Sequence, residues 1–312
     1  MADHSTDLSG VITHPSTSCE SGFPFQHEVC LHACLMLRKA WWERECSEFA
    51  VGYEVSEIPK FDDVVCKFKF HRKDHDIYFQ AKHTERITKK ISKDLLFSTS
   101  SSKSSRDWDL KQYFKSMINL KDNKNTNQKF ILITNTHLKE IEMVDFPIDD
   151  SEINKLLKNL RENEAKIQRF SRSLEKDFKN LLQEEIRSQD NLNYIFENLI
   201  IVTNCPDLKK LTEINNELTN KMVDKENTTY FPDIVRKKIS QHIEFDRKSK
   251  TRRFITETDF ETIRANSLVD FDLQCPTVVI EPDMKTQQKN ALKYYEQKAK
   301  KHWTRLKTKG RF

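Results

Sequence analysis

The segment from Phe61 to His83, FDDVVCKFKFHRKDHDIYFQAKH, contains two β-strand patterns separated by a short polar interval. The first, VVCKFKF (64–70), begins with β-branched residues and then alternates apolar and basic side chains. The second, IYFQAKH (77–83), again alternates around aromatic and aliphatic residues. Runs of this kind on either side of a polar interval are typical of paired strands. We therefore predict a β-hairpin, with HRKDHD (71–76) as its turn.

Further runs extend this picture to a sheet with helices. FILITNT (130–136) is almost wholly apolar, as expected of a central strand that is covered on both faces. NLIIVTNC (198–205) also ends its apolar run in Thr-Asn, so it could lie in the same sheet, although Thr-Asn is a common strand exit. Residues 26–46 have a buried helical face at a period of 3.6. The sequence therefore predicts an α/β (α+β) fold with a core sheet flanked by helices.

A heptad pattern marks the next region. The apolar residues that recur every seven positions are Ile153, Leu160, Ile167, Leu174 and Leu181. This spacing predicts one long amphipathic helix over 151–187. The second set of heptad positions that should be apolar is instead polar at Asn163, Asp177 and Glu184. We therefore favour a helical hairpin arm or a partner-docking and self-association helix over a long parallel coiled coil.

Composition excludes several classes of protein. The 312 residues include only 4 glycines, so neither a P-loop nor a GxGxxG turn can be written and no nucleotide cofactor is expected. No stretch is apolar for long enough to span a membrane, and the first residues lack the pattern of a secretory signal. The 7 cysteines are scattered without a CxxC motif, which indicates reduced thiols. We expect an intracellular protein of the nucleus or cytoplasm.

Four segments are predicted along the chain. Residues 1–21 are polar and aperiodic and are predicted to form a disordered arm. Residues 22–148 carry the predicted core domain, and residues 149–284 are predicted to be mainly helical with one or two returning strands. Residues 285–312 form a basic terminal helix or tail, with ten Lys or Arg residues against the single acid Glu296.

Such a tail either attracts nucleic acid or is the solvated face of a helix. The predicted nucleic-acid contacts are Arg72, Lys73, Lys300, Lys301, Arg305 and Lys307.

Polar side chains gather on one face of the predicted hairpin. Gln80 and Lys82 are two residues apart on a strand and therefore share a face. Asp62 and Asp63 stand at the start of the partner strand, and the sequence does not decide which of them faces that side. Carboxylates that hold Mg²⁺ beside a lysine are the groups that phosphodiester hydrolysis requires. His27, Cys30 and Cys34 also share a helical face, but buried thiols are a simpler explanation there than zinc.

The segments FDDVV (61–65) and YFQAKH (78–83) resemble the core of the PD-(D/E)XK nuclease superfamily. The similarity extends to GFPFQHE (22–28), DLKQYF (109–114) and FILITNT, and so covers about residues 20–136. It is nearest to Mrr-like restriction endonucleases, to the nuclease domain of anti-phage effectors linked to cyclic-nucleotide signalling, and to uncharacterised insect proteins. The resemblance implies a restriction-endonuclease-like core.

The resemblance also implies roles for individual residues. Lys82 would be the catalytic lysine, and Gln80 would occupy a position usually held by Asp or Glu. Asp62 or Asp63 would be the principal ligand of Mg²⁺ or Mn²⁺, with Glu28 contacting the metal or its water. The glutamine is a departure from the usual pattern, because an amide carries no charge and so lowers metal affinity.

Two functions from different classes follow. The first is metal-dependent hydrolysis of DNA by a weakly sequence-selective endonuclease. The alternative is a catalytically inactive nuclease-fold protein that acts as a nucleic-acid or protein-binding module. A purely structural helical protein is a third reading.

Overall fold

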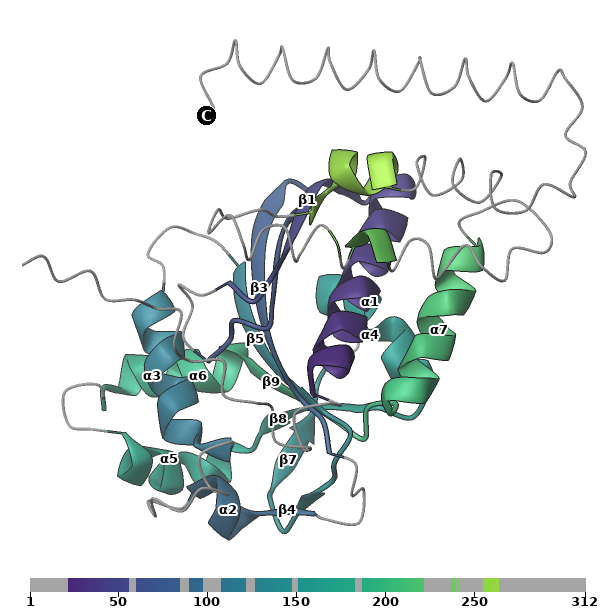
Figure 1. Ribbon diagram of the computed structural model, residues 1–312. Helices are drawn as coiled ribbons and strands as arrows, with labels where there is room; N and C mark the ends of the chain where they lie inside the picture. Colours follow the sequence, from purple (N-terminus) through teal and green to yellow (C-terminus); the bar gives the residue numbers. More distant parts are fainter. Residues whose placement is uncertain are drawn as a thin grey trace, which may run out of the picture.

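The computed structural model describes residues 22–55, 60–84, 90–97, 108–121, 127–147, 151–182, 187–221, 237–239, 241 and 255–263. The predicted arm at 1–21 and the basic tail at 285–312, with Lys300, Lys301, Arg305 and Lys307, lie outside these residues. In the part of the chain that is described, an eight-stranded mixed sheet runs through the molecule in the order β10-β1-β2-β3-β5-β9-β8-β7 (Figure 1). The predicted α/β fold class, with a core sheet flanked by helices, is confirmed.

The strands are β1 Cys46–Tyr53, β2 Val64–Phe70, β3 Lys73–Lys82, β4 Ile91–Ser92, β5 Asn127–Thr134, β6 Leu138–Lys139, β7 Met143–Asp145, β8 Lys166–Phe170, β9 Leu199–Thr203 and β10 Ile255–Thr256. The helices are α1 Gly22–Trp42, α2 Lys93–Phe97, α3 Leu110–Leu120, α4 Ser151–Glu162, the 3-10 turn η3 Arg172–Leu174, α5 Glu175–Leu181, α6 Gln189–Asn198 and α7 Leu208–Lys221.

Helices cover both faces of the sheet and so create two apolar cores. One core joins α1, α4 and α7 to the face that carries Phe79 and Ile133. The other joins α2, α3, α5 and α6 to the face that carries Tyr78 and Leu132. Figure 1 shows the two groups of helices on opposite sides of the strands. Because side chains alternate along a strand, β3 and β5 contribute to both cores.

The predicted hairpin is formed by β2 and β3, but its turn is shorter than expected. Phe70 pairs with Lys73, so only His71 and Arg72 make the turn and the rest of the polar interval belongs to β3. Both turn residues have positive φ, 47° and 68°. Two consecutive residues of this kind match a type I′ turn, whose twist suits paired strands even without the usual glycine.

The two runs that end in Thr-Asn lie side by side. β5 pairs in parallel with β3 on one side and with β9 on the other, with Ile131 opposite Ile200. The sheet therefore takes strands from both sides of residue 148, and the region after that residue adds β8, β9 and β10. The Thr-Asn pairs mark the carboxyl edge of these parallel strands.

The long helix predicted over 151–187 is wrong. α4 ends at Glu162, and Glu164 adopts a positive φ of 71° that a continuing helix does not allow. The Leu160 carbonyl then accepts hydrogen bonds from the backbone N–H groups of Asn163 and Ala165, which closes the helix end. The chain continues as β8 and α5, so a coiled coil or a docking helix over this range is excluded.

The heptad residues are instead shared between the two cores. Ile153, Leu160 and Ile167 lie on the α1 side of the sheet, whereas Leu174 and Leu181 lie on the α3 side. All are buried. The sevenfold spacing therefore arises from burial in four different elements, namely α4, β8, η3 and α5, and not from one helical stripe.

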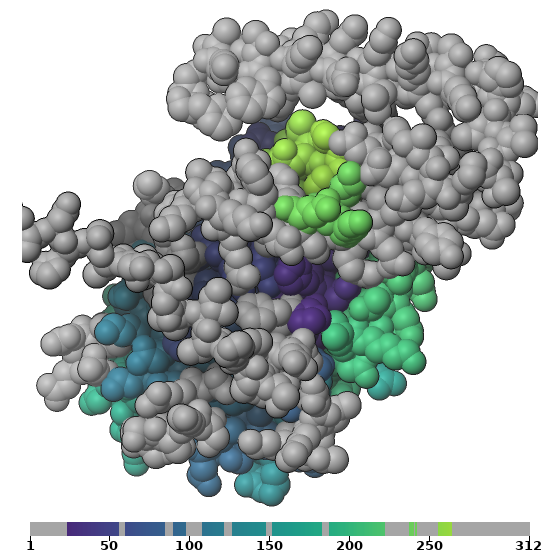
Figure 2. Space-filling view, viewed as in Figure 1, coloured from purple at the N-terminus to yellow at the C-terminus, as the bar shows by residue number. Residues whose placement is uncertain are grey.

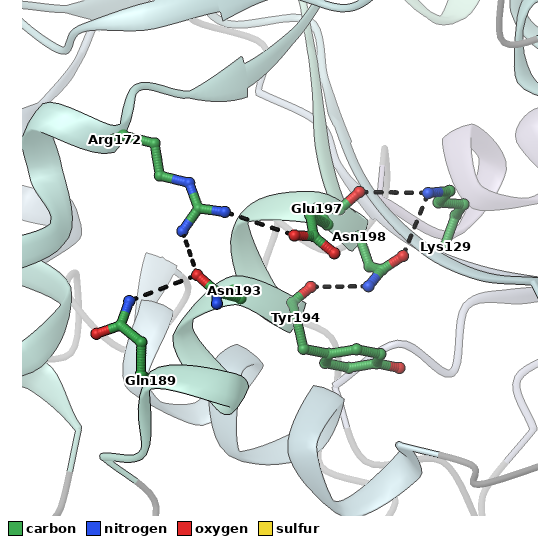
Figure 3. A network of polar contacts seen from close by, with 7 residues as sticks. All are labelled: Lys129, Arg172, Gln189, Asn193, Tyr194, Glu197 and Asn198. Atoms are coloured by element: carbon green, nitrogen blue, oxygen red, sulfur yellow. Dashed lines mark hydrogen bonds and ion pairs between the residues drawn. The ribbon is translucent and has the colours of Figure 1, made fainter.

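A polar network fixes α6 beside the sheet (Figure 3). Lys129 of β5 donates to the Glu197 carbonyl at 3.3 Å and to Asn198 Oδ1 at 3.2 Å, so it neutralises the negative end of the helix. Arg172 donates to Asn193 Oδ1 at 2.7 Å, and its guanidinium lies 3.6 Å from the Glu197 carboxylate. These contacts tie α6 to the elements on either side of it.

None of the described helices is long and apolar enough to cross a membrane.

Candidate functional site

The carboxyl group of Asp63 lies at the centre of the predicted site. Its Oδ2 atom accepts hydrogen bonds from Gln80 Nε2 and, at 2.7 Å, from the backbone N–H of Ala81. Gln26 of α1 also hydrogen bonds to it. Burial raises the pKa of Asp63 to about 7, although the Ala81 N–H, the Lys82 ammonium and Gln26 all act to lower it. This carboxyl is therefore close to half protonated at neutral pH.

Asp62 and Lys82 complete the polar side of this cluster. Both side chains are half-buried, and the two charges attract each other. Burial raises the pKa of Asp62, while Lys82 and Lys60 lower it. The structure therefore brings together Asp62, Asp63, Gln80 and Lys82, as the strand alternation predicted. It also answers the question left open by the sequence, since Asp63 is the acid that faces Gln80.

Three consecutive residues at the start of α1 contact residues at the ends of three different strands. The Phe25 ring lies 4.9 Å from the His83 ring after β3, and Gln26 bonds to Asp63 before β2. The His27 ring lies 4.5 Å from that of Tyr53 at the end of β1. The N-terminal part of α1 (purple) reaches the surface beside α7 (green) in Figure 2. The first turns of α1 therefore frame the cluster.

Glu28, which we predicted to face the cluster, points elsewhere. Its Oε2 atom accepts a hydrogen bond of 2.8 Å from Asn215 of α7. Residues two apart on a helix point about 200° away from each other. Gln26 is therefore the α1 residue that contacts Asp63, and the sequence analysis missed it. Gln26 lies two residues before Glu28 in the FQHE segment, but the sequence does not show which of the two side chains faces Asp63.

Asn135 closes the carboxyl edge next to the cluster. Its side chain accepts from the backbone N–H of Thr84 at 3.0 Å and donates to the Thr84 carbonyl at 2.8 Å. It thereby joins the chain after β5 to the chain after β3. The Thr-Asn motif noted in the sequence is part of the structural frame of this edge.

Arg72 and Lys73 lie at the opposite end of the hairpin from Lys82. They are exposed at the β2–β3 turn. β3 spans residues 73–82, and nine steps along a strand are about 30 Å. The structure does not bring them together with the cluster, and their role in nucleic-acid binding stays a prediction.

The cluster as it stands does not match a Mg²⁺ site. Mg²⁺ requires oxygen ligands, but Gln80 turns its N–H group, and not its carbonyl oxygen, toward Asp63. The same Asp63 oxygen is occupied by the Ala81 N–H. Among the residues that the structure describes, no group of three or more His, Cys, Asp or Glu side chains could hold a metal ion. The Mg²⁺ or Mn²⁺ cofactor stays a prediction from the resemblance, without support from this geometry.

No protein-family model matches the sequence, and no curated protein matches it. Three solved structures that do match are described as the Acinetobacter baumannii Cap4 SAVED/CARF-domain containing receptor. The one with the cyclic trinucleotide 2'3'3'-cAAA has a TM-score of 0.43 and 13% identity, and it covers 81% of this chain and 46% of its own. The one with 3'3'3'-cAAA has a TM-score of 0.41 and 12% identity, over 81% and 49% of the two chains.

The third is described without a ligand and has a TM-score of 0.41 at 12% identity, over 83% and 49% of the two chains. This chain thus spans about half the length of the structures that it matches. At this level the likeness does not carry the ligand of those receptors over to this chain.

The predicted resemblance to PD-(D/E)XK nucleases is wrong, and with it the main prediction of metal-dependent DNA hydrolysis. The structures that match are described as receptors and not as restriction endonucleases or other hydrolases. The site gives a physical reason, since Asp63 is bound by protein donors. The alternative prediction of a binding module stays a prediction.

Proposed function

We propose that this chain is a binding module for a nucleic-acid ligand, and that it holds this ligand, without cutting it, at the cluster of Asp62, Asp63, Gln80 and Lys82. The observation that carries this proposal is the state of the Asp63 carboxyl. It accepts from Gln80 and Ala81, and burial raises its pKa to about 7. A carboxyl with these hydrogen bonds and this pKa fixes the positions of the neighbouring side chains. It is poorly suited to hold a divalent ion.

The charge of the cluster favours an anionic ligand over a metal. Lys82 and Lys60 both lie close enough to Asp62 to lower its pKa. Partial protonation of Asp63 at neutral pH reduces the negative charge that opposes them. Lysines that contact phosphates supply affinity without reading a base sequence.

Aromatic rings at the same end of the sheet favour nucleic acid over other anions. The His27–Tyr53 and Phe25–His83 ring pairs flank the same end of β3. His27, Tyr53 and His83 are half-buried. Proteins hold single-stranded nucleic acid by combining cations with aromatic side chains.

A cyclic oligonucleotide belongs to the same chemical class. The small number of glycines excludes only Gly-rich phosphate loops, and a site made of lysines, amides and rings does not need them. A cyclic trinucleotide of the kind named for two of the matched receptors is therefore a second probe.

The test compares fluorescence anisotropy of labelled 12-nucleotide single strands of DNA and RNA in EDTA. The matched control for Lys82→Ala is Lys158→Ala, an exposed lysine of α4. We expect the wild type and Lys158→Ala to bind alike. Lys82→Ala should bind more weakly, with a slope of log affinity against log salt that is smaller by about 0.7. Absence of binding by the wild type, or equal binding by all three proteins, would overturn the proposal.

A further inference from the structure

Asn215 of α7 links two residues of α1 inside the protein. It is fully buried. Its Nδ2 atom donates to Glu28 Oε2 at 2.8 Å and to the Glu28 carbonyl at 2.9 Å. Its Oδ1 atom lies 2.9 Å from His32 Nδ1. Because both Glu28 atoms are acceptors, they fix the orientation of the amide, and the proton of the His32 contact must sit on Nδ1.

This link keeps the same protonation state near neutral pH. Burial lowers the pKa of His32 to about 4, although the hydrogen bond to Asn215 and the backbone of Leu156 act to raise it. The ring is therefore neutral where the protein operates. Asn215 joins α1 to α7 as a permanent clamp and not as a pH-dependent one.

The clamp holds the part of α1 that frames the candidate site. Glu28 is two residues from Gln26, which bonds to Asp63, and three from Phe25, whose ring contacts His83. A helical turn is a rigid unit, since its backbone hydrogen bonds fix the relative directions of successive side chains. The position of Glu28 against α7 therefore sets where the Gln26 amide and the flanking rings lie.

We propose that Asn215 is a positioning residue for the ligand site, acting from a helix 187 residues away in sequence. It does not touch the ligand. It holds the first turns of α1 so that Gln26 reaches Asp63 and the rings of Phe25 and His27 reach His83 and Tyr53. This inference rests on the proposed function, and it gives α7 a part in that function.

The test uses Asn215→Leu, which removes every hydrogen bond of the clamp while keeping a buried side chain of similar size. Its matched control is Thr219→Ala in the same helix. The Thr219 hydroxyl donates to the Asn215 carbonyl at 2.7 Å, within α7 itself. Both variants therefore lose a buried polar group of α7, but only the first loses the link to α1. We expect the affinity for a labelled single strand to fall about tenfold in Asn215→Leu and to change less than twofold in Thr219→Ala.

A ligand-free measurement separates the two proposals. In ¹⁵N NMR spectra, the side-chain NH₂ of Gln26 and the backbone N–H of Ala81 should shift in Asn215→Leu and stay in place in Thr219→Ala. Unchanged signals in Asn215→Leu would overturn the positioning role, even if affinity fell. If the wild type binds no nucleic acid, the proposed function fails, yet these signals still decide the role of Asn215.

A second variant covers the case in which Asn215→Leu does not fold. Glu28→Met removes the acceptor carboxylate from the α1 side and leaves α7 unchanged. Smaller shifts of Gln26 and Ala81 are expected in it, because the bonds of Asn215 to the backbone carbonyl of residue 28 and to His32 remain. Their absence would contradict the inference.

Discussion

The Asp63 carboxyl shows how protein donors hold a buried acid in place. Burial raises its pKa, whereas the N–H of Ala81 and the charge of Lys82 oppose that rise. The result is a group that titrates near neutrality in the folded protein and near 4 in an unfolded chain. The folded state therefore holds the proton more tightly than the unfolded state does.

This difference predicts a dependence of stability on pH. The contribution of the Asp63 proton to stability is fully present below about pH 4 and is lost as the pH rises to about 7. Asp63→Asn removes the titration. Relative to the wild type, its free energy of unfolding should therefore be higher at pH 8 than at pH 5 by about 2–3 kcal/mol. Urea unfolding at the two pH values measures this difference.

The control for that measurement is Asp145→Asn, at an exposed carboxyl of β7 that accepts a hydrogen bond from Gln168. It should leave the pH profile of the wild type unchanged. A constant gap between Asp63→Asn and the wild type from pH 5 to pH 8 would show that Asp63 does not titrate in this range.

Strand alternation predicted part of the cluster. It placed Gln80 and Lys82 on one face, and the β2–β3 register brings Asp63 opposite Gln80. Glu28 was misplaced because the rotation of α1 about its axis depends on the packing of α1 against α7, which has no local signal in the sequence. Gln26 was missed for the same reason.

At the scale of elements, local chemistry predicted the strands better than the boundaries between them. The hairpin turn is confined to His71 and Arg72 although six polar residues separate the apolar runs. A strand that leaves the apolar core continues as a polar strand, and the sequence pattern does not show where it ends. α4 ends for a reason that hydrophobic spacing also does not reveal, namely the left-handed conformation of Glu164.

The hairpin turn supports a prediction about stability. Arg72 has a φ of 68°, which costs free energy for a residue with a Cβ atom. Arg72→Gly should therefore raise the free energy of unfolding by about 0.5–1 kcal/mol. The greater entropy of glycine in the unfolded chain reduces this gain. Asp74→Gly, in the extended part of β3, should lower it. Thermal unfolding of both variants checks the sign, and a loss of stability in Arg72→Gly would contradict the strain argument.

At the scale of the whole molecule, a continuous sheet separates two apolar cores. Strands from before and after residue 148 contribute to it, and the two groups meet where β5 pairs with β9. Long-range pairing of this kind is not encoded in any one segment, and it overrides a regular heptad spacing. The similar apolar runs of β5 and β9 were the one local hint of their pairing.

The heptad residues distinguish a core from an association surface. Leu160 and Leu181 are both buried, one in each core. Leu160→Ala and Leu181→Ala should each lower the free energy of unfolding by about 2–4 kcal/mol and leave the sedimentation coefficient of the folded protein unchanged. If both variants instead dissociated an oligomer without lowering the free energy of unfolding, these residues would form a self-association surface and not a core.

Binding without cleavage is the central claim about this protein. The most direct measurement follows an end-labelled 12-nucleotide single strand on a denaturing gel after incubation with the protein in Mg²⁺, using a sample shown by anisotropy to be bound. We predict a strand of full length, and equal binding in Mg²⁺ and in EDTA. Shortened fragments that form with the wild type in Mg²⁺ and disappear with Lys82→Ala would contradict the claim.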